Sequence, residues 1–156
     1  MANLFVPKSP RVRVRSTADQ NRANGSFLTF AANGSQNNDS HVYNQFGMYD
    51  STVSNEDIVL PQSGVYLFTI SVAFGPAQGT GYRQLILFSS NITGTSSNIV
   101  EYVNATGNAT VMNMSYMGIG GAGQTYQVRV NHTFGGSVLV LANRLFFGAT
   151  FMRPSV

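Results

Sequence analysis

The sequence has no cysteine and few charged side chains, and each absence argues against a class of protein. Without cysteine there are no disulfides, thiolate zinc sites or cysteine nucleophiles. Charged residues make up 10% of the 156 residues, against about 25% in an average domain, which argues against a long solvated helix or coiled coil. Intrinsic disorder is equally disfavoured, because 43% of the residues are hydrophobic and 12% are aromatic.

Long apolar segments are also missing. No apolar run approaches the roughly 18–20 residues of a membrane span, and the first residues lack the apolar stretch of a signal peptide. We therefore expect a protein that is made in a cytoplasm and has no membrane partner.

Acidic residues are scarce and unevenly placed, since none follows Glu101. Residues 1–22 hold five basic residues and one acid, a net +4, whereas residues 23–156 hold four basic and five acidic residues, a net −1. The whole formal charge of +3 therefore resides in the N-terminal segment.

Small polar residues and short β-type segments make up much of the chain. Asn, Ser and Thr number 15, 16 and 12, a composition that suits strands joined by tight turns. We predict an extended arm over 1–10, with Pro7 and Pro10, followed by one all-β domain over 11–156. The ten predicted strands cover 11–15, 27–32, 41–49, 65–74, 82–90, 98–103, 110–117, 125–134, 137–141 and 144–152.

Three motifs in order carry a resemblance to a known family. The segment Leu60–Phe68, LPQSGVYLF, has the spacing apolar-Pro-x-x-Gly-x-Tyr-x-Phe before a β-branched strand. It resembles the jelly roll shared by the complement globular heads and the tumour-necrosis-factor cytokines. Gly123–Val128 resembles the Gly-Asp-x-Val entry to a late strand of that family, with Gln124 in place of the acid, and Phe146–Phe151 resembles its terminal strand. The resemblance spans about residues 11–153.

The resemblance implies a ten-stranded jelly roll that assembles as a homotrimer. The apolar strands favour this independently, because they offer more apolar surface than one small sandwich needs, and an oligomer interface covers such an excess. The competing interpretation is that these residues fill the core of one protomer. The predicted interface residues are Leu85, Leu87, Tyr116, Tyr126, Val128 and Phe151.

The best candidate for a binding site is the basic N-terminal segment. RVRVR at 11–15 alternates strictly, so Val12 and Val14 face a core while the arginines share the other face, about 6.6–7 Å apart. Planar guanidinium groups suit docking onto an acidic protein surface. Nucleic acid is the rival partner, disfavoured by the low net charge and by the lack of interleaved aromatic residues. The predicted docking residues are Phe5, Lys8, Arg11, Arg13 and Arg15.

Other motifs support no chemistry. GIGGAG at 118–123 matches G-x-G-x-x-G, but a strand follows it where a dinucleotide site needs a helix. Asp50, Glu56 and Asp57 lack the spacing of a calcium loop, and His41 and His132 have no nucleophile elbow nearby. We therefore assign no catalytic, metal or cofactor residue and expect a protein that is not an enzyme.

These features together favour a structural protein of a virion. The leading hypothesis is a trimeric capsid decoration (cement) protein of a phage, with the basic arm and strand docked on the major capsid protein or another virion protein. The alternative is a receptor-binding or adhesion head on a tail fibre or surface appendage, with the loops 33–40, 75–81 and 91–97 in contact with a ligand. A secreted cytokine-like ligand is the third class, and it requires export.

Overall fold

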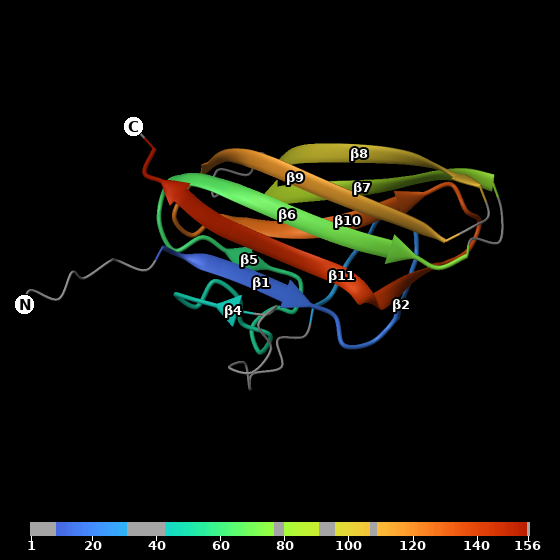
Figure 1. The fold of residues 1–156 in the computed structure, drawn as a ribbon, viewed down its shortest axis with the longest axis horizontal. Helices are drawn as coiled ribbons and strands as arrows, with labels where there is room; N and C mark the ends of the chain where they lie inside the picture. Colours follow the sequence, from blue (N-terminus) through green and yellow to red (C-terminus); the bar gives the residue numbers. More distant parts are fainter. Residues whose placement is uncertain (1–8, 31–42, 77–79, 91–95, 107–108, 156) are drawn as a thin grey trace, which may run out of the picture.

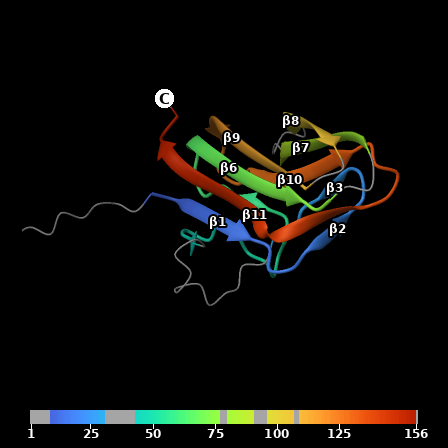
Figure 2. The ribbon, with the colours of Figure 1, turned by 45° about the vertical axis from the view of Figure 1, so that its right-hand side comes forward.

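The computed structural model describes residues 9–30, 43–76, 80–90, 96–106 and 109–155. These residues form eleven strands in two antiparallel sheets that pack face to face (Figure 1, Figure 2). The strands are β1 (Arg11–Arg15), β2 (Gln20–Arg22), β3 (Ser26–Phe27), β4 (Tyr43–Asn44), β5 (Ile58–Val59), β6 (Gly64–Phe74), β7 (Thr80–Ser90), β8 (Ser96–Thr106), β9 (Thr110–Gly120), β10 (Thr125–His132) and β11 (Val138–Arg153).

The strand order is that of a sandwich in which most consecutive strands lie in different sheets. The first sheet, sheet A, has the order β4-β1-β11-β6-β9, with β2 also paired to β11. The second, sheet B, has the order β3-β10-β7-β8, with β5 also paired to β10. Non-consecutive neighbours such as β11 and β6 require connections that cross from one sheet to the other, as in a jelly roll. In Figure 1, β1, β11, β6 and β9 lie side by side in the layer nearer to the viewer.

The predicted strands agree with the structure best where the apolar pattern is longest. The prediction for 11–15 is confirmed to the residue, and the strand predicted at 65–74 is β6. Two short strands, β2 and β5, were not predicted, because two or three residues carry no period. The predicted break at 142–143 is wrong: β11 continues through it, and a register shift between Leu141 and Phe146 absorbs the extra residues as a bulge.

The core lies between the sheets and is built by alternate residues of the long strands. Tyr66, Phe68, Ile70 and Val72 point inward from β6 and are buried. The Phe68 ring stacks on that of Tyr126 from sheet B, with 4.2 Å between the centroids. Each such side chain contributes about 1.5–3 kcal/mol by leaving water, so these contacts hold the two sheets together.

Gly64, the glycine of the first sequence motif, is required by close packing. A Cβ atom there would lie 2.7 Å from the carbonyl oxygen of Arg153 and would collide with the Phe151 ring. Glycine therefore allows β11 to lie against the start of β6. Among the described residues, no helix is long and apolar enough to span a membrane.

Candidate docking face

The outer face of sheet A, opposite the core, carries the arginines that the sequence analysis selected. In β1, Val12 and Val14 are fully buried against the core, whereas Arg11, Arg13 and Arg15 are exposed or half-buried on the other side. This confirms the alternation predicted for residues 11–15. We call Arg11, Arg13 and Arg15 the arginine row.

Contacts within the protein orient two members of the arginine row. The Arg11 Nε atom donates to Gln45 Oε1 at 3.2 Å, and its guanidinium carbon lies 4.9 Å from the centroid of the Tyr43 ring. The guanidinium carbon of Arg13 lies 4.5 Å from the centroid of the Phe146 ring. Within the described part of the chain, no carboxylate forms an ion pair with Arg11 or Arg13. These two cations are thus held in place by neutral groups, which leaves their charge available to an acidic partner.

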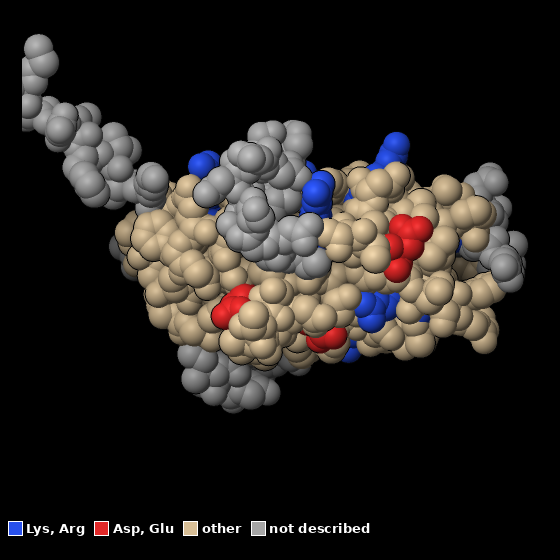
Figure 3. Space-filling view, turned by 90° about the horizontal axis from the view of Figure 1, so that it is seen from below, with Lys and Arg blue, Asp and Glu red and all other residues tan. Residues whose placement is uncertain are grey.

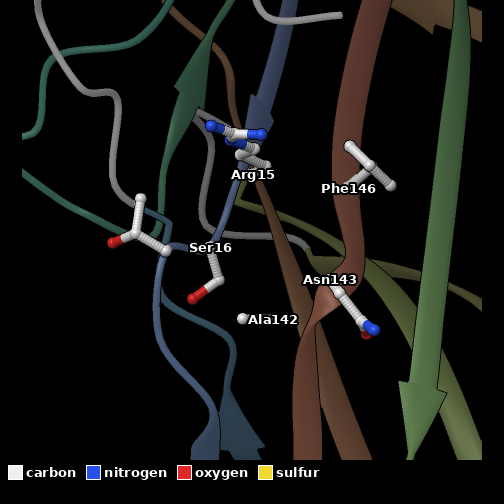
Figure 4. A pocket seen from close by; sticks show the side chains of 6 residues that line it. Arg15, Ser16, Ala142, Asn143 and Phe146 are labelled. Carbon is white, nitrogen blue, oxygen red and sulfur yellow. The ribbon is translucent and has the colours of Figure 1, made fainter.

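A shallow pocket of about 330 Å³ adjoins the arginine row where β11 bulges (Figure 4). The main-chain N–H of Ala142 donates to Asp19 Oδ1 at 2.8 Å, which fixes the bulge. The pocket therefore presents a guanidinium, hydroxyl groups, an amide and an aromatic ring. Its lining residues are Arg15, Ser16, Thr17, Ala142, Asn143 and Phe146.

The far end of the same outer face is apolar. Met117 and Ile119 project from β9 with 63% and 72% of their surface exposed. Val65 and Leu67, half-exposed, stand opposite them in register on β6. We call Val65, Leu67, Met117 and Ile119 the apolar patch. Since β9 is an edge strand of sheet A, the patch lies at the border of the sheet.

The apolar patch and the arginine row lie towards opposite edges of the outer face, on β6 with β9 and on β1, and β11 runs between them. Farther along β6 and β9 from the patch, the outward positions include Thr69, Ser71, Asn113 and Ser115. In the view of the edge near β1 and β4, acidic and basic groups stand as separate spots among uncharged residues (Figure 3). The outer face of sheet A thus has one cationic end and one apolar end.

Most of the predicted interface residues are in the wrong place for an interface. Leu85, Leu87, Tyr126 and Val128 are buried between the sheets of one protomer, so the interpretation that they fill its core is correct for these four. Sequence alternation shows which residues of a strand share a face, but not which face is inner when both are apolar. Outward-facing Met117 and Ile119 were not among the predicted interface residues, although the alternation along β9 places Met117 on the face opposite to Met112 and Met114.

Two other predicted interface residues are half-buried. Tyr116 and Phe151 pack against the edge of the core, and the ring centroid of Phe151 lies 5.4 Å from that of Tyr66. Their part in an interface stays a prediction. Phe5 and Lys8 of the predicted docking arm lie outside the described residues. Pro10, at the predicted end of the arm, is buried, and its carbonyl oxygen accepts the N–H of Phe151 at 2.8 Å.

The remaining motifs take structural positions. Gly118–Gly120 ends β9, and the rest of GIGGAG leads into β10, so a strand does follow it. The Asp50 side chain accepts hydrogen bonds from the hydroxyl and the main-chain N–H of Thr52, which lower the pKa of that carboxyl. Among the described residues, no three His, Cys, Asp or Glu side chains are grouped so that they could hold a metal ion.

Burial shifts the pKa of a tyrosine in the core. Desolvation, assisted by the neighbouring Tyr116 and Tyr66, raises the pKa of Tyr126 to about 12. Desolvation also raises the pKa of Tyr66, partly opposed by its hydrogen bond to the Gln62 carbonyl oxygen. Both tyrosines join the two sheets as neutral groups, and neither opens onto the outer face of sheet A.

Comparison with known proteins confirms the predicted fold. No family model and no curated protein matches the sequence, but solved structures match over almost the whole chain. Murine APRIL at pH 5.0 superposes with a TM-score of 0.70 at 10% identity, covering 93% of this chain and 100% of that one. The globular domain of zebrafish complement 1qA gives a TM-score of 0.66 at 12% identity, covering 95% of this chain and 100% of that one.

Murine APRIL at pH 8.5 gives a TM-score of 0.68 at 8% identity, with 93% of this chain and 100% of that one covered. These neighbours have the jelly roll of the tumour-necrosis-factor-like and complement globular heads. The resemblance inferred from the motifs at 60–68, 123–128 and 146–151 is therefore correct for the fold. At such low identity the likeness concerns the fold alone.

Proposed function

We propose that this chain is a non-enzymatic head domain that assembles as a homotrimer and decorates an assembled viral shell, docking through its basic strand. The observation that carries the proposal is the division of one face of sheet A into an apolar patch and an arginine row in which Arg11 and Arg13 are held by neutral groups. An apolar end suits permanent contact with another copy, whereas a cationic end suits attachment to an acidic surface.

The apolar patch supports the homotrimer. Met117 and Ile119 are long apolar side chains left largely in water, next to Val65 and Leu67 on an unpaired sheet edge. Each 100 Å² of apolar surface buried between copies contributes about 2.5 kcal/mol before the entropy of association is subtracted. Burying this end is also cheap in desolvation, because the described outward positions of β6 and β9 carry no charge. Light scattering should give three times 16.8 kDa, about 50 kDa.

The arginine row supports docking on protein. Arg11 and Arg13 are pre-oriented by Tyr43, Gln45 and Phe146, so little side-chain entropy is lost when a carboxylate binds. A decoration protein that binds the assembled shell more tightly than free shell subunits stabilises the shell by mass action. In this proposal the protein is made in the host cytoplasm and ends in the virion.

The decisive experiment counts copies on purified particles. The triple variant Arg11→Gln, Arg13→Gln and Arg15→Gln should remain a folded trimer and lose most of its occupancy, whereas wild type should copurify at hundreds of copies per particle. The control is Arg144→Gln, because Arg144 is an exposed arginine outside the row. Full occupancy of the triple variant, or only a handful of wild-type copies, would contradict the proposal.

The alternative function, a receptor-binding or adhesion head, is favoured by the pocket beside Arg15. A guanidinium, hydroxyl groups, an amide and an aromatic ring around about 330 Å³ are the groups that recognise a carboxylated sugar. A glycan array probed with the trimer tests this function. Binding that is lost in Asn143→Ala but kept in Arg144→Gln would favour the adhesion head over the decoration protein.

A further inference from the structure

Arg83 is a cation enclosed between the two sheets. Only 1% of its surface is exposed, and it is the one Lys, Arg, Asp or Glu among the described residues that is fully buried. It points inward from β7 in line with Leu85 and Leu87, near the end of the sandwich where β6 stops. A position that continues an apolar row is thus occupied by a permanent positive charge.

Neutral groups at the end of β6 surround part of the guanidinium. Arg83 Nη2 donates at 3.3 Å to the carbonyl oxygen of Gly75, which follows β6, and the guanidinium carbon lies 5.1 Å from the centroid of the Phe74 ring. The other terminal nitrogen, Nη1, is buried and has no hydrogen-bond partner among the described residues. One carbonyl dipole and one ring face supply only partial negative charge, and burial lowers the pKa of Arg83 accordingly.

His132 stands directly opposite Arg83 in the register of β10 and β7. Its side chain is 2% exposed and shares the inner face of sheet B. His132 Nε2 lies 3.2 Å from the carbonyl oxygen of Arg22 and must donate to it, because a carbonyl only accepts. His132 Nδ1 is buried and, like Arg83 Nη1, has no hydrogen-bond partner in the part of the chain that the structure describes.

No described carboxylate balances this pair. Among the described residues, no acid forms an ion pair with Arg83, and the segment packed against it contributes Phe74, the last residue of β6, and Gly75 after it. The other charged residue nearby, Arg22 on β2, gives its guanidinium to Gln20 Oε1 and Thr29 Oγ1. Since an isolated buried charge is strongly disfavoured, the site has the chemistry of an anion receptor.

We propose that Arg83 and His132 form an internal site for one small inorganic anion of the chloride class. Arg83 Nη1 donates to the anion, and a water that donates to both the anion and His132 Nδ1 completes the site, while His132 Nε2 keeps its bond to the Arg22 carbonyl oxygen. The anion supplies the negative charge that the described groups around Arg83 lack. A site filled by water alone differs, because it leaves the charge of Arg83 unbalanced and does not respond to the kind of anion in solution.

Thermal unfolding of the wild-type protein separates these cases. The melting temperature is measured in sodium chloride, bromide and gluconate at equal ionic strength and equal pH. Gluconate is too large for a site enclosed between the sheets, whereas chloride at ten times its Kd should raise the melting temperature by about 3–5 °C. Equal melting temperatures in chloride and gluconate would overturn the proposal.

Two variants locate the effect. Arg83→Met keeps an unbranched chain of similar length without charge and should abolish the difference between chloride and gluconate. Arg144→Gln removes an exposed arginine and should keep it. A difference that persists in Arg83→Met would place the anion elsewhere and contradict the site.

Should Arg83→Met fail to fold, wild-type crystals grown in sodium bromide decide the question. An anomalous peak within hydrogen-bond distance of Arg83 Nη1 is the expected result. An ordered water there without anomalous signal would overturn the proposal. Neither outcome depends on whether the protein trimerises or docks on a shell.

Discussion

The two faces of sheet A carry different kinds of residue. The inner face holds the residues that stabilise the fold, and the outer face holds the residues that are available to a partner. The inner face is mainly apolar, with Val14, Phe68 and Phe147 fully buried and Gln20 as a buried polar exception. The outer face passes from the arginine row on β1 across β11 to the apolar patch on β6 and β9. Scattered polar residues on the outer face are enough for solubility. The arginine row and the apolar patch are clustered instead, and such clusters are typical of surfaces that bind a partner.

The largest effect is expected on the inner face. Phe68→Ala removes a ring that stacks on Tyr126 and should lower the free energy of unfolding by about 3–5 kcal/mol. Thr69→Ala, the next residue on the outer face, should change it by less than about 0.5 kcal/mol. Urea unfolding measures both, and similar losses from the two variants would show that the outer face also belongs to the protomer core.

The apolar patch should govern assembly rather than folding. Met117→Lys combined with Ile119→Lys places two charges on the surface that the trimer is proposed to bury, and the mass in light scattering should fall from about 50 kDa to that of one chain of 16.8 kDa. Lysine is well tolerated on an exposed edge strand, so far-UV circular dichroism should stay unchanged. Ala109→Lys, at an exposed position before β9, is the matched control.

A mass of about 50 kDa that persists in the variant with Met117→Lys and Ile119→Lys would contradict the role of the apolar patch in the trimer. It would mean that copies meet on a different surface and that the apolar patch faces some other partner. The arginine row would then no longer need to lie at the rim of an interface.

Alkaline pH should act through the core tyrosines. The pKa of Tyr126 is about 12 in the folded protein and about 10 in an unfolded chain, so the folded state keeps its proton longer. Stability is therefore fully present below pH 10 and is lost as the pH rises from 10 towards 12. Tyr126→Phe should reduce the loss by about 1–2 kcal/mol. Urea unfolding at pH 9 and pH 11.5 checks this, with Tyr82→Phe as control; equal losses in wild type and Tyr126→Phe would contradict it.

Alternation along single strands predicted more of this molecule than any other signal in the sequence. RVRVR gave the correct strand and the correct inner residues, since a polar-apolar alternation has only one way to face a core. The motif at 60–68 correctly indicated the fold. Pro61 favours the turn before β6, and Gly64 allows the close contact between β6 and β11 that a larger residue would disturb. The strands that are apolar on both sides, such as YRQLILFSS, gave no sign of which face is inner.

The composition of the candidate site was therefore only half predictable. The arginine row followed from the sequence, but the pocket depends on the bulge in β11, which brings Asn143 and Phe146 to the end of β1. Such a bulge is decided by pairing with β6 and β1, not by local preference. Arg83 lies in a predicted strand, but the sequence does not show that it is buried. Its burial depends on packing against the end of β6, which belongs to the other sheet.

The smallest effect on stability, and the sharpest test of the outer face, concerns Arg13. Its cation–π contact with Phe146 is partly exposed, so Arg13→Lys should change the free energy of unfolding by less than about 1 kcal/mol. If docking uses the planar guanidinium in a two-pronged contact with a carboxylate, Arg13→Lys should still weaken attachment to particles about tenfold, because lysine keeps the charge but not the fork. Occupancy of Arg13→Lys equal to that of wild type would mean that the arginine row acts through its charge alone. In that case attachment of the wild-type protein to particles should weaken steeply as the salt concentration rises.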